Sequence, residues 1–168
     1  MPLTKIQSLG ITDGTIVNAD INASAAIAGT KLTGVGKVLQ VITATDSTGR
    51  TTSSTSFVTA SNTLSVSITP SSASNKVFII VHTSMYKNAG SAAFALFRDA
   101  SSIGTFAFVG TGGVDPILPL AFSVLDSPSS TSSLTYQFYF KSNGGASPAV
   151  DIQSNSILGT ITAFEIAG

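Results

Sequence analysis

The residues of this sequence that could perform chemistry are few and widely separated. His82 is the single histidine, it ends an apolar stretch, and no Gly-x-Ser-x-Gly pattern supplies a serine nucleophile for it. The run Ser84-Met85-Tyr86-Lys87 matches a Ser-x-x-Lys pattern, but its companion motifs are absent and it follows an apparent strand. We therefore predict that the chain is not an enzyme, and we assign no catalytic residue.

Ligands for metals and cofactors are equally scarce. The chain has no cysteine and one histidine, which argues against a zinc site. The acidic residues stand singly and lack the spacing of a calcium loop. They are Asp13, Asp20, Asp46, Asp99, Asp115, Asp126, Asp151 and Glu165. Gly34-Val35-Gly36-Lys37 lacks the serine or threonine and the upstream glycine of a phosphate-binding loop. We predict no metal site and no cofactor.

The composition excludes several classes of partner. Charged residues make up 10% of the 168 residues, and eight basic residues balance eight acidic ones. Without a basic stripe, nucleic acid is not expected as a partner. The longest apolar runs, such as Val77 to Val81, are far shorter than a membrane span. The weakly charged surface, rich in serine and threonine, suits close contact with other proteins.

Residues 1–34 differ from the rest and are predicted to form an extended N-terminal stem. Large aliphatic side chains recur there every five residues, with one step of six, between small turn-forming residues. They are Ile6, Ile11, Ile16, Ile21, Ile27 and Leu32. Five residues advance a helix by about 140° beyond a full turn, so these side chains share no helical face. The stem is either a disordered tail or an anchor that orders against partner chains, and the regular spacing favours the anchor.

An estimate of free energies supports partners for the stem. Burying six aliphatic side chains contributes about 9–18 kcal/mol, at roughly 1.5–3 kcal/mol each. Ordering some thirty residues costs about 30–60 kcal/mol of backbone entropy. The stem therefore cannot order itself alone.

Residues 35–168 carry the pattern of an all-β domain, predicted to be an antiparallel β-sandwich of jelly-roll-like type. Leu64 to Ile68 alternates strictly, as a half-buried strand does, whereas the continuous run Val77 to Val81 suits a central strand covered on both faces. Further strands are expected near residues 93–97, 103–108, 120–125, 134–141 and 159–166, separated by turn clusters. Charges at Arg98 and Asp99 are expected in a solvated hairpin turn, and Glu165 on a solvent face or interface.

Aromatic residues on one expected strand suggest association between copies. Tyr136, Phe138 and Phe140 share one face of it, and Tyr139 lies on the other. Both faces of the strand should then be covered, one by the second sheet and one by another subunit. We predict a homo-oligomer with these four residues at the subunit interface.

The residues from Asp13 to Leu32 resemble the stem repeat of bacteriophage tail-fibre and related virion proteins. The stretch from Lys37 to Val58 looks like the start of the head domain often attached to that stem. The closing run Ile161 to Ile166 is similar to the last strand of trimeric, tumour-necrosis-factor-like jelly rolls. The resemblance implies a homotrimer in a virion, synthesised in the host cytoplasm. The long N-terminal anchoring domain and shaft of tail fibres are not seen in this sequence, which puts the kind of fibre in doubt.

Three functions are considered on this basis. The first is a virion structural protein that attaches to the particle by its stem and presents the head to the host surface, with a receptor or glycan as partner. The second is a capsid decoration or head-fibre protein that stabilises the particle together with other virion proteins. The third, a carbohydrate-cleaving fibre enzyme, needs paired carboxylates, and the scattered single Asp residues argue against it.

Overall fold

A computed structural model describes residues 37–59, 64–87, 91–109, 117–143 and 149–168. The predicted stem, with Ile6, Ile11, Ile16, Ile21, Ile27 and Leu32, lies outside the described residues, so its anchoring role stays a prediction. Residues 36–168 form one unit by internal contacts, and the described part of it is built from strands with one short 3₁₀ turn, η4 (Ser154–Ser156). Within this described part, no helix is long and apolar enough to cross a membrane.

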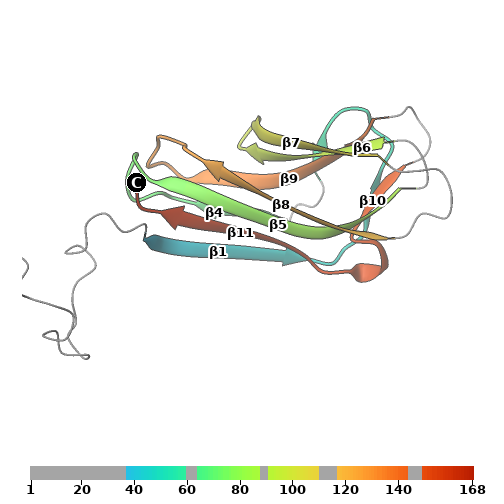
Figure 1. Ribbon diagram of the computed structural model, residues 1–168, viewed down its shortest axis with the longest axis horizontal. Coiled ribbons are helices and arrows are strands. Elements are labelled where there is room, and N and C mark those ends of the chain that lie inside the picture. Colours follow the sequence, from blue (N-terminus) through green and yellow to red (C-terminus); the bar gives the residue numbers. More distant parts are fainter. Residues whose placement is uncertain (1–36, 60–63, 88–90, 110–116, 144–148) are drawn as a thin grey trace, which may run out of the picture. The chain divides into compact units, whose positions relative to one another are not determined.

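Two antiparallel sheets pack face to face, as the two layers in Figure 1 show. The long strands of the first sheet are, in order, β1 (Val38–Asp46), β11 (Gly159–Ile166), β5 (Lys76–Lys87) and β8 (Leu118–Asp126). Two short strands complete this sheet: β10 (Val150–Ile152) pairs with β5, and β2 (Arg50–Thr52) pairs with β10. The second sheet runs β4 (Ser65–Ile68) and β3 (Val58–Thr59), both beside β9 (Leu134–Ser142), then β6 (Ser91–Arg98) and β7 (Ser101–Val109).

The order of the long strands is that of a jelly roll. Taken along the chain, the principal strands are β1, β4, β5, β6, β7, β8, β9 and β11. The first sheet holds the first, eighth, third and sixth of them, and the second sheet holds the second, seventh, fourth and fifth. This is the two-Greek-key arrangement. The prediction of an antiparallel, jelly-roll-like β-sandwich is therefore confirmed.

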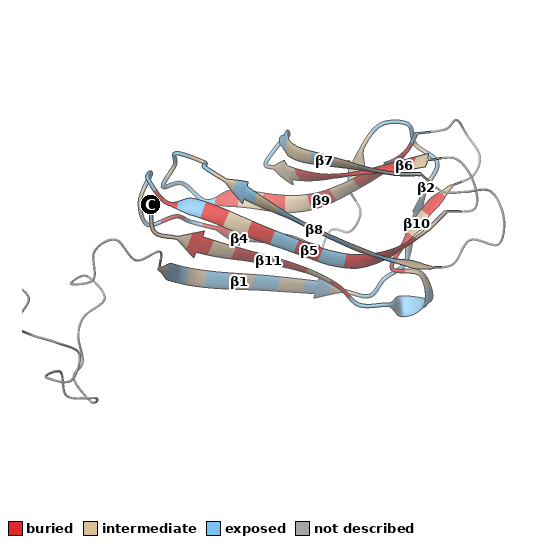
Figure 2. Ribbon diagram, in the orientation of Figure 1, coloured by how far each residue is buried: buried red, intermediate tan, exposed pale blue. Residues whose placement is uncertain are grey.

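The core lies between the two sheets and follows the two-residue period of strands. On β9, the alternate residues from Leu134 to Ser142 are buried, and Phe138 stacks on Phe94 of β6 with ring centroids 5.9 Å apart. On β5, the odd-numbered residues Val77, Ile79 and Val81 are fully buried. Figure 2 shows this alternation along β5 as buried and exposed bands.

β5 is a central strand, as its continuous apolar run predicts, but the described residues cover only one of its faces. The outward-facing Phe78 is half-buried and Ile80 remains 39% exposed. The expectation of cover on both faces is thus not met by the described part of the chain. Phe78 and Ile80, the outward residues of the run, do not pack between the two sheets and lie on the outer face of the first sheet.

Candidate assembly interface

Strand β11 places its one carboxylate on the inward side and its largest apolar side chain on the outward side. The residues that point inward and are buried are Gly159, Ile161, Ala163 and Glu165. The residues that point outward and are partly exposed are Thr160, Thr162, Phe164 and Ile166. The expectation that Glu165 faces solvent or an interface is therefore wrong. The alternation of the strand was predicted correctly, but its phase was reversed, because a carboxylate is rarely placed inside.

An apolar row crosses the outer face of the first sheet. Leu125 of β8 pairs with Phe78 of β5, Phe78 pairs with Phe164 of β11, and Phe164 pairs with Val41 of β1. Directly paired residues of antiparallel strands point to the same side of the sheet. Leu125 and Val41, at the two ends of the row, are 54% and 53% exposed.

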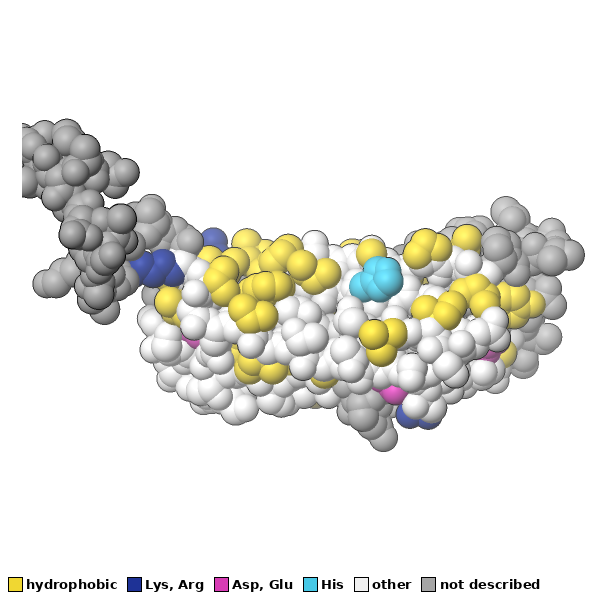
Figure 3. Space-filling model, turned by 90° about the horizontal axis from the view of Figure 1, so that it is seen from below, with side chains coloured by type: hydrophobic (Ala, Val, Ile, Leu, Met, Phe, Trp, Pro, Cys, Tyr) yellow, Lys and Arg dark blue, Asp and Glu magenta, His cyan; other side chains and the backbone are white. Residues whose placement is uncertain are grey.

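Further apolar side chains extend this row. Ile80 lies two residues beyond Phe78 on β5, and Ile166 pairs with Val38 at the start of β1, where a register irregularity adds the exposed Leu39. We call these outward residues of β1, β11, β5 and β8 the apolar face. Figure 3 views the molecule from this side and shows hydrophobic side chains spread across it.

The apolar face carries little charge. Among the outward positions of its four strands, the ionisable side chains are Lys76 at one end of β5, His82 near its middle, and Tyr86. His82 is exposed, between Ala121 of β8 and Thr160 of β11 in its row. These outward positions include no carboxylate. A surface of this kind loses little hydration free energy when another apolar surface covers it.

Glu165 organises the sandwich beneath the apolar face. Its side chain is 1% exposed, and its carboxylate accepts hydrogen bonds from Gln40 Nε2 at 2.6 Å, Asn75 Nδ2 at 2.5 Å, and the Ser71 amide and hydroxyl at 2.6 and 2.8 Å. Burial alone raises the pKa of Glu165, but these hydrogen bonds outweigh it and leave the pKa below its ordinary value. The carboxylate thus joins β1, β11 and the turn before β5, which is a structural role.

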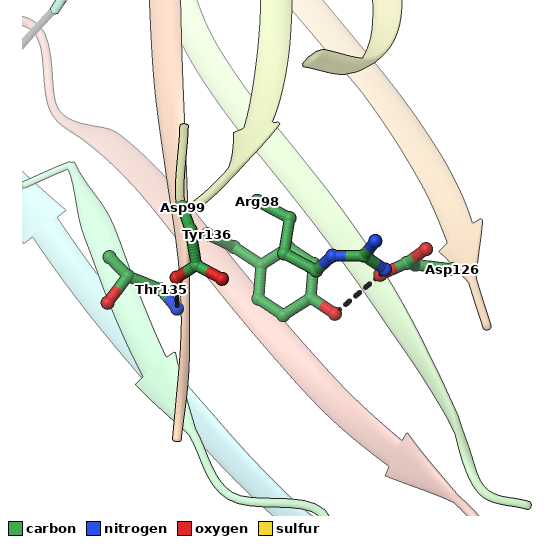
Figure 4. A network of polar contacts seen from close by, with 5 residues as sticks. All are labelled: Arg98, Asp99, Asp126, Thr135 and Tyr136. Carbon is green, nitrogen blue, oxygen red and sulfur yellow. Dashed lines mark hydrogen bonds and ion pairs between the residues drawn. The ribbon is translucent and has the colours of Figure 1, made fainter. Parts of the chain in front are cut away.

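A second polar network ties the two sheets together. Asp126, at the end of β8, accepts hydrogen bonds from Arg98 Nη1 of β6 and from the Tyr136 hydroxyl of β9, each at 2.7 Å (Figure 4). The hydrogen bond to Asp126 raises the pKa of Arg98, and burial raises the pKa of Tyr136. Arg98 therefore does not stand in a solvated turn as predicted, because its guanidinium reaches across to the first sheet. The neighbouring Asp99 is exposed in the β6–β7 hairpin turn, as predicted, and its carboxylate accepts a hydrogen bond from the Thr135 amide of β9.

The outer face of the second sheet is different in kind. Its outward residues include Ser65 and Ser67 on β4, and Thr135 and Gln137 on β9. Its aromatic residues pack on one another: the rings of Phe97 and Tyr139 stack at 4.1 Å, and Phe57 meets Phe97 edge-on at 5.8 Å. Lys141 Nζ lies 4.9 Å above the Phe57 ring. This cluster of aromatic residues is half-buried by its own contacts.

The four residues predicted at a subunit interface separate into two sets. Tyr136, Phe138 and Phe140 are at most 1% exposed and fill the core of a single chain. Tyr139 is the one of the four that lies on an outer face, that of the second sheet. The prediction that β9 has apolar residues on both faces is accurate, and a subunit contact at β9 stays a prediction. The apolar face was not predicted from the sequence, although two of its residues, Phe78 and Ile80, belong to the apolar run Val77–Val81.

The described residues show no arrangement that suggests catalysis or metal binding. No group of three or more His, Asp or Glu residues there could hold a metal ion. Asp126 and Glu165 are each held by hydrogen-bond donors of the fold itself. In the described part of the chain these two carboxylates hold strands and turns together, and the first sheet carries the apolar face.

No protein-family model matches this chain, and a search of curated proteins finds no relative. Solved structures with some similarity include the VP2 subviral particle of infectious bursal disease virus, at 17% identity and a TM-score of 0.42, covering 77% of this chain and 33% of that chain. The Gx strain of the same virus gives 15% identity and a TM-score of 0.42 over 80% of this chain and 33% of that one. The chain thus spans about a third of the length of these structures. Likeness at this level carries no argument about function.

Proposed function

We propose that this protein is a bacteriophage virion structural protein whose β-sandwich heads associate, as a homotrimer, through the apolar face. The observation that carries the proposal is the apolar row from Leu125 to Val41, which crosses four strands and is left uncovered by the residues that the structure describes. Folded monomers rarely expose a contiguous apolar surface without a use for it.

A second copy of this chain is the occupant that the face fits. The chain has no net charge, and the four strands present no carboxylate outward, so copies can meet across the row without opposed acidic groups. Lys76 is the outward charged residue nearest the row: it lies two residues before Phe78 on β5 and pairs with Ile166 of β11. The resemblance of the closing strand to trimeric jelly rolls agrees with threefold association. This face replaces β9 as the proposed site of contact.

The virion assignment rests on the N-terminal residues. The stretch from Asp13 to Leu32 resembles the stem repeat of virion fibre proteins, and its evenly spaced aliphatic residues need partner chains to become ordered. We propose that the stem attaches the protein to other virion proteins while the head faces the host surface. The alternative is a capsid decoration or head-fibre protein, in which the same parts stabilise the particle. Neither role involves catalysis.

The native mass of the purified full chain tests the association. We expect a trimer at micromolar concentration, and a monomer over the whole concentration range would contradict the proposal. Deleting residues 1–34 tests the stem: the shortened chain should still fold and associate but should no longer be found on virus particles. If particles retain it, the stem is not the anchor. Imaging the protein on the particle distinguishes a tail fibre from a capsid decoration.

A further inference from the structure

His82 occupies an unusual place on the apolar face. Its imidazole is exposed near the middle of β5, and its neighbours on the same side are Ile80 and Ser84 along the strand. Across the sheet it pairs with Ala121 of β8 and Thr160 of β11. Figure 3 shows the histidine among the hydrophobic side chains of this face. It is the only histidine of the chain, and its strand neighbours carry neither positive nor negative charge.

We infer that His82 makes association through the apolar face sensitive to pH, because the imidazole must be neutral when a second copy covers it. This inference rests on the proposed association of heads. Covering His82 removes water from the ring, and the same face of another copy offers an imidazolium no carboxylate from β1, β11, β5 or β8. An unpaired charge that loses its water is strongly disfavoured, so the proton is lost instead.

Asp46 of β1 lies two strands away from His82 but on the inward side of its strand. The charged and titratable groups on the same side of the sheet as His82 are too far away to provide a counter-charge. Lys76, six residues away on β5, lies at roughly 20 Å and Tyr86, four residues away, at about 13 Å along the strand. Asp151 of β10 pairs with Tyr86 and so lies at about the same distance as Tyr86 or farther. The elements beside His82, β8 and β11, present Pro119, Ala121, Ser123, Thr160 and Thr162 on this side.

The sign and size of the effect follow from proton linkage. Association disfavours the protonated imidazole, because its charge would be covered without a counter-charge. The associated state then binds fewer protons, so lower pH favours separation. If each associated imidazole is neutral, lowering the pH from 7.5 to 5.0 weakens association by about 30-fold for each subunit. For three subunits the combined loss is about 10⁴-fold.

The test compares the full-length protein with His82→Gln, which keeps a polar side chain of similar length and cannot be protonated. The association constant is measured by native mass determination in dilution series at pH 7.5, 6.5, 5.5 and 5.0. Subunit exchange between isotopically light and heavy copies gives the same comparison if the assembly is too tight to dilute apart. Far-ultraviolet circular dichroism shows that the heads stay folded.

The expected result is loss of association, or much faster exchange, of the natural protein between pH 6.5 and 5.0, with His82→Gln unchanged over the same range. Equal behaviour of both proteins overturns the inference, whether both keep or both lose their association. Assembly at pH 7.5 that is insensitive to pH overturns the role of His82 alone. A monomer at pH 7.5 overturns the proposed association and this inference together.

Discussion

The two outer faces of the sandwich differ although both belong to sheets of the same core. The exposed large hydrophobic residues of the described chain are Val38, Leu39, Val41, Ile80, Leu125, Ile157 and Leu158. Five of them lie on β1, β5 and β8 of the first sheet, two lie just before β11, and none lies on β3, β4, β6, β7 or β9 of the second. The second sheet instead presents serine, threonine and glutamine around a cluster of packed aromatic residues.

This difference distinguishes the apolar surface that folding requires from an apolar surface that folding does not require. Folding needs one apolar face on each sheet, which both sheets supply to the core. An apolar outer face contributes nothing to that core and increases the risk of aggregation. Its presence on one sheet alone agrees with the proposed contact between heads, for which the described residues provide no cover.

The largest effect is expected from a charge on the apolar face. Val41→Asp places a carboxylate at the end of the apolar row, where the side chain is exposed in the single chain. Burying it in a contact without a partner costs several kcal/mol per subunit, so association should weaken at least about 100-fold. Sedimentation or native mass determination measures this.

Thr105→Glu is the matched control for that experiment, because Thr105 is exposed on β7 of the second sheet. The control should keep the mass of the natural protein. If Thr105→Glu dissociates the assembly and Val41→Asp does not, the contact lies on the second sheet.

A smaller effect, on folding rather than association, is expected from Glu165→Ala. The substitution leaves donors of Gln40, Asn75 and Ser71 without their buried acceptor. We expect the free energy of unfolding to fall by about 3 kcal/mol. Chemical denaturation of the head measures it, and Glu165→Gln should recover part of the loss. Unchanged stability would mean that the inward carboxylate is not structural.

The pH dependence of folding stability provides a third test. Because the pKa of Glu165 is lowered in the folded head, its contribution is present above the unfolded value of about 4.3 and is lost as the pH falls through the folded pKa. Denaturation midpoints should therefore decline below about pH 4.3, and less steeply in Glu165→Gln. This experiment measures folding of the head, whereas the comparison with His82→Gln measures association, so the two effects are separable. A midpoint that falls equally in both proteins would rule out Glu165 as the cause.

The smallest effect is expected on the second sheet. Tyr139→Ser removes a ring that stacks on Phe97 and should lower stability by about 1 kcal/mol without changing the mass of the assembly. Thermal denaturation and native mass determination measure the two quantities. A drop in mass would support the interface predicted at Tyr139 from the sequence and would remove the contrast between the two faces.

Much of the fold could be predicted from the sequence because its signals are local. The alternation from Leu64 to Ile68, the long apolar run of β5 and the turn clusters gave the strands and the sandwich class. The alternation of aromatic residues on β9 was also predictable from the sequence. The candidate site was not, since its residues come from four strands that are far apart in sequence and meet only through the strand order β8, β5, β11, β1.

The sequence by itself determined the period of each strand, whereas the tertiary structure decided which side of each strand faces the core. In β11 the residues from Gly159 to Ile166 fit either phase, and transfer free energies favour Phe164 and Ile166 inside. The fold reverses this choice because Gln40, Ser71 and Asn75 surround Glu165 with donors that repay its burial. Those partners lie 90 or more residues away along the chain, so no local pattern could reveal them.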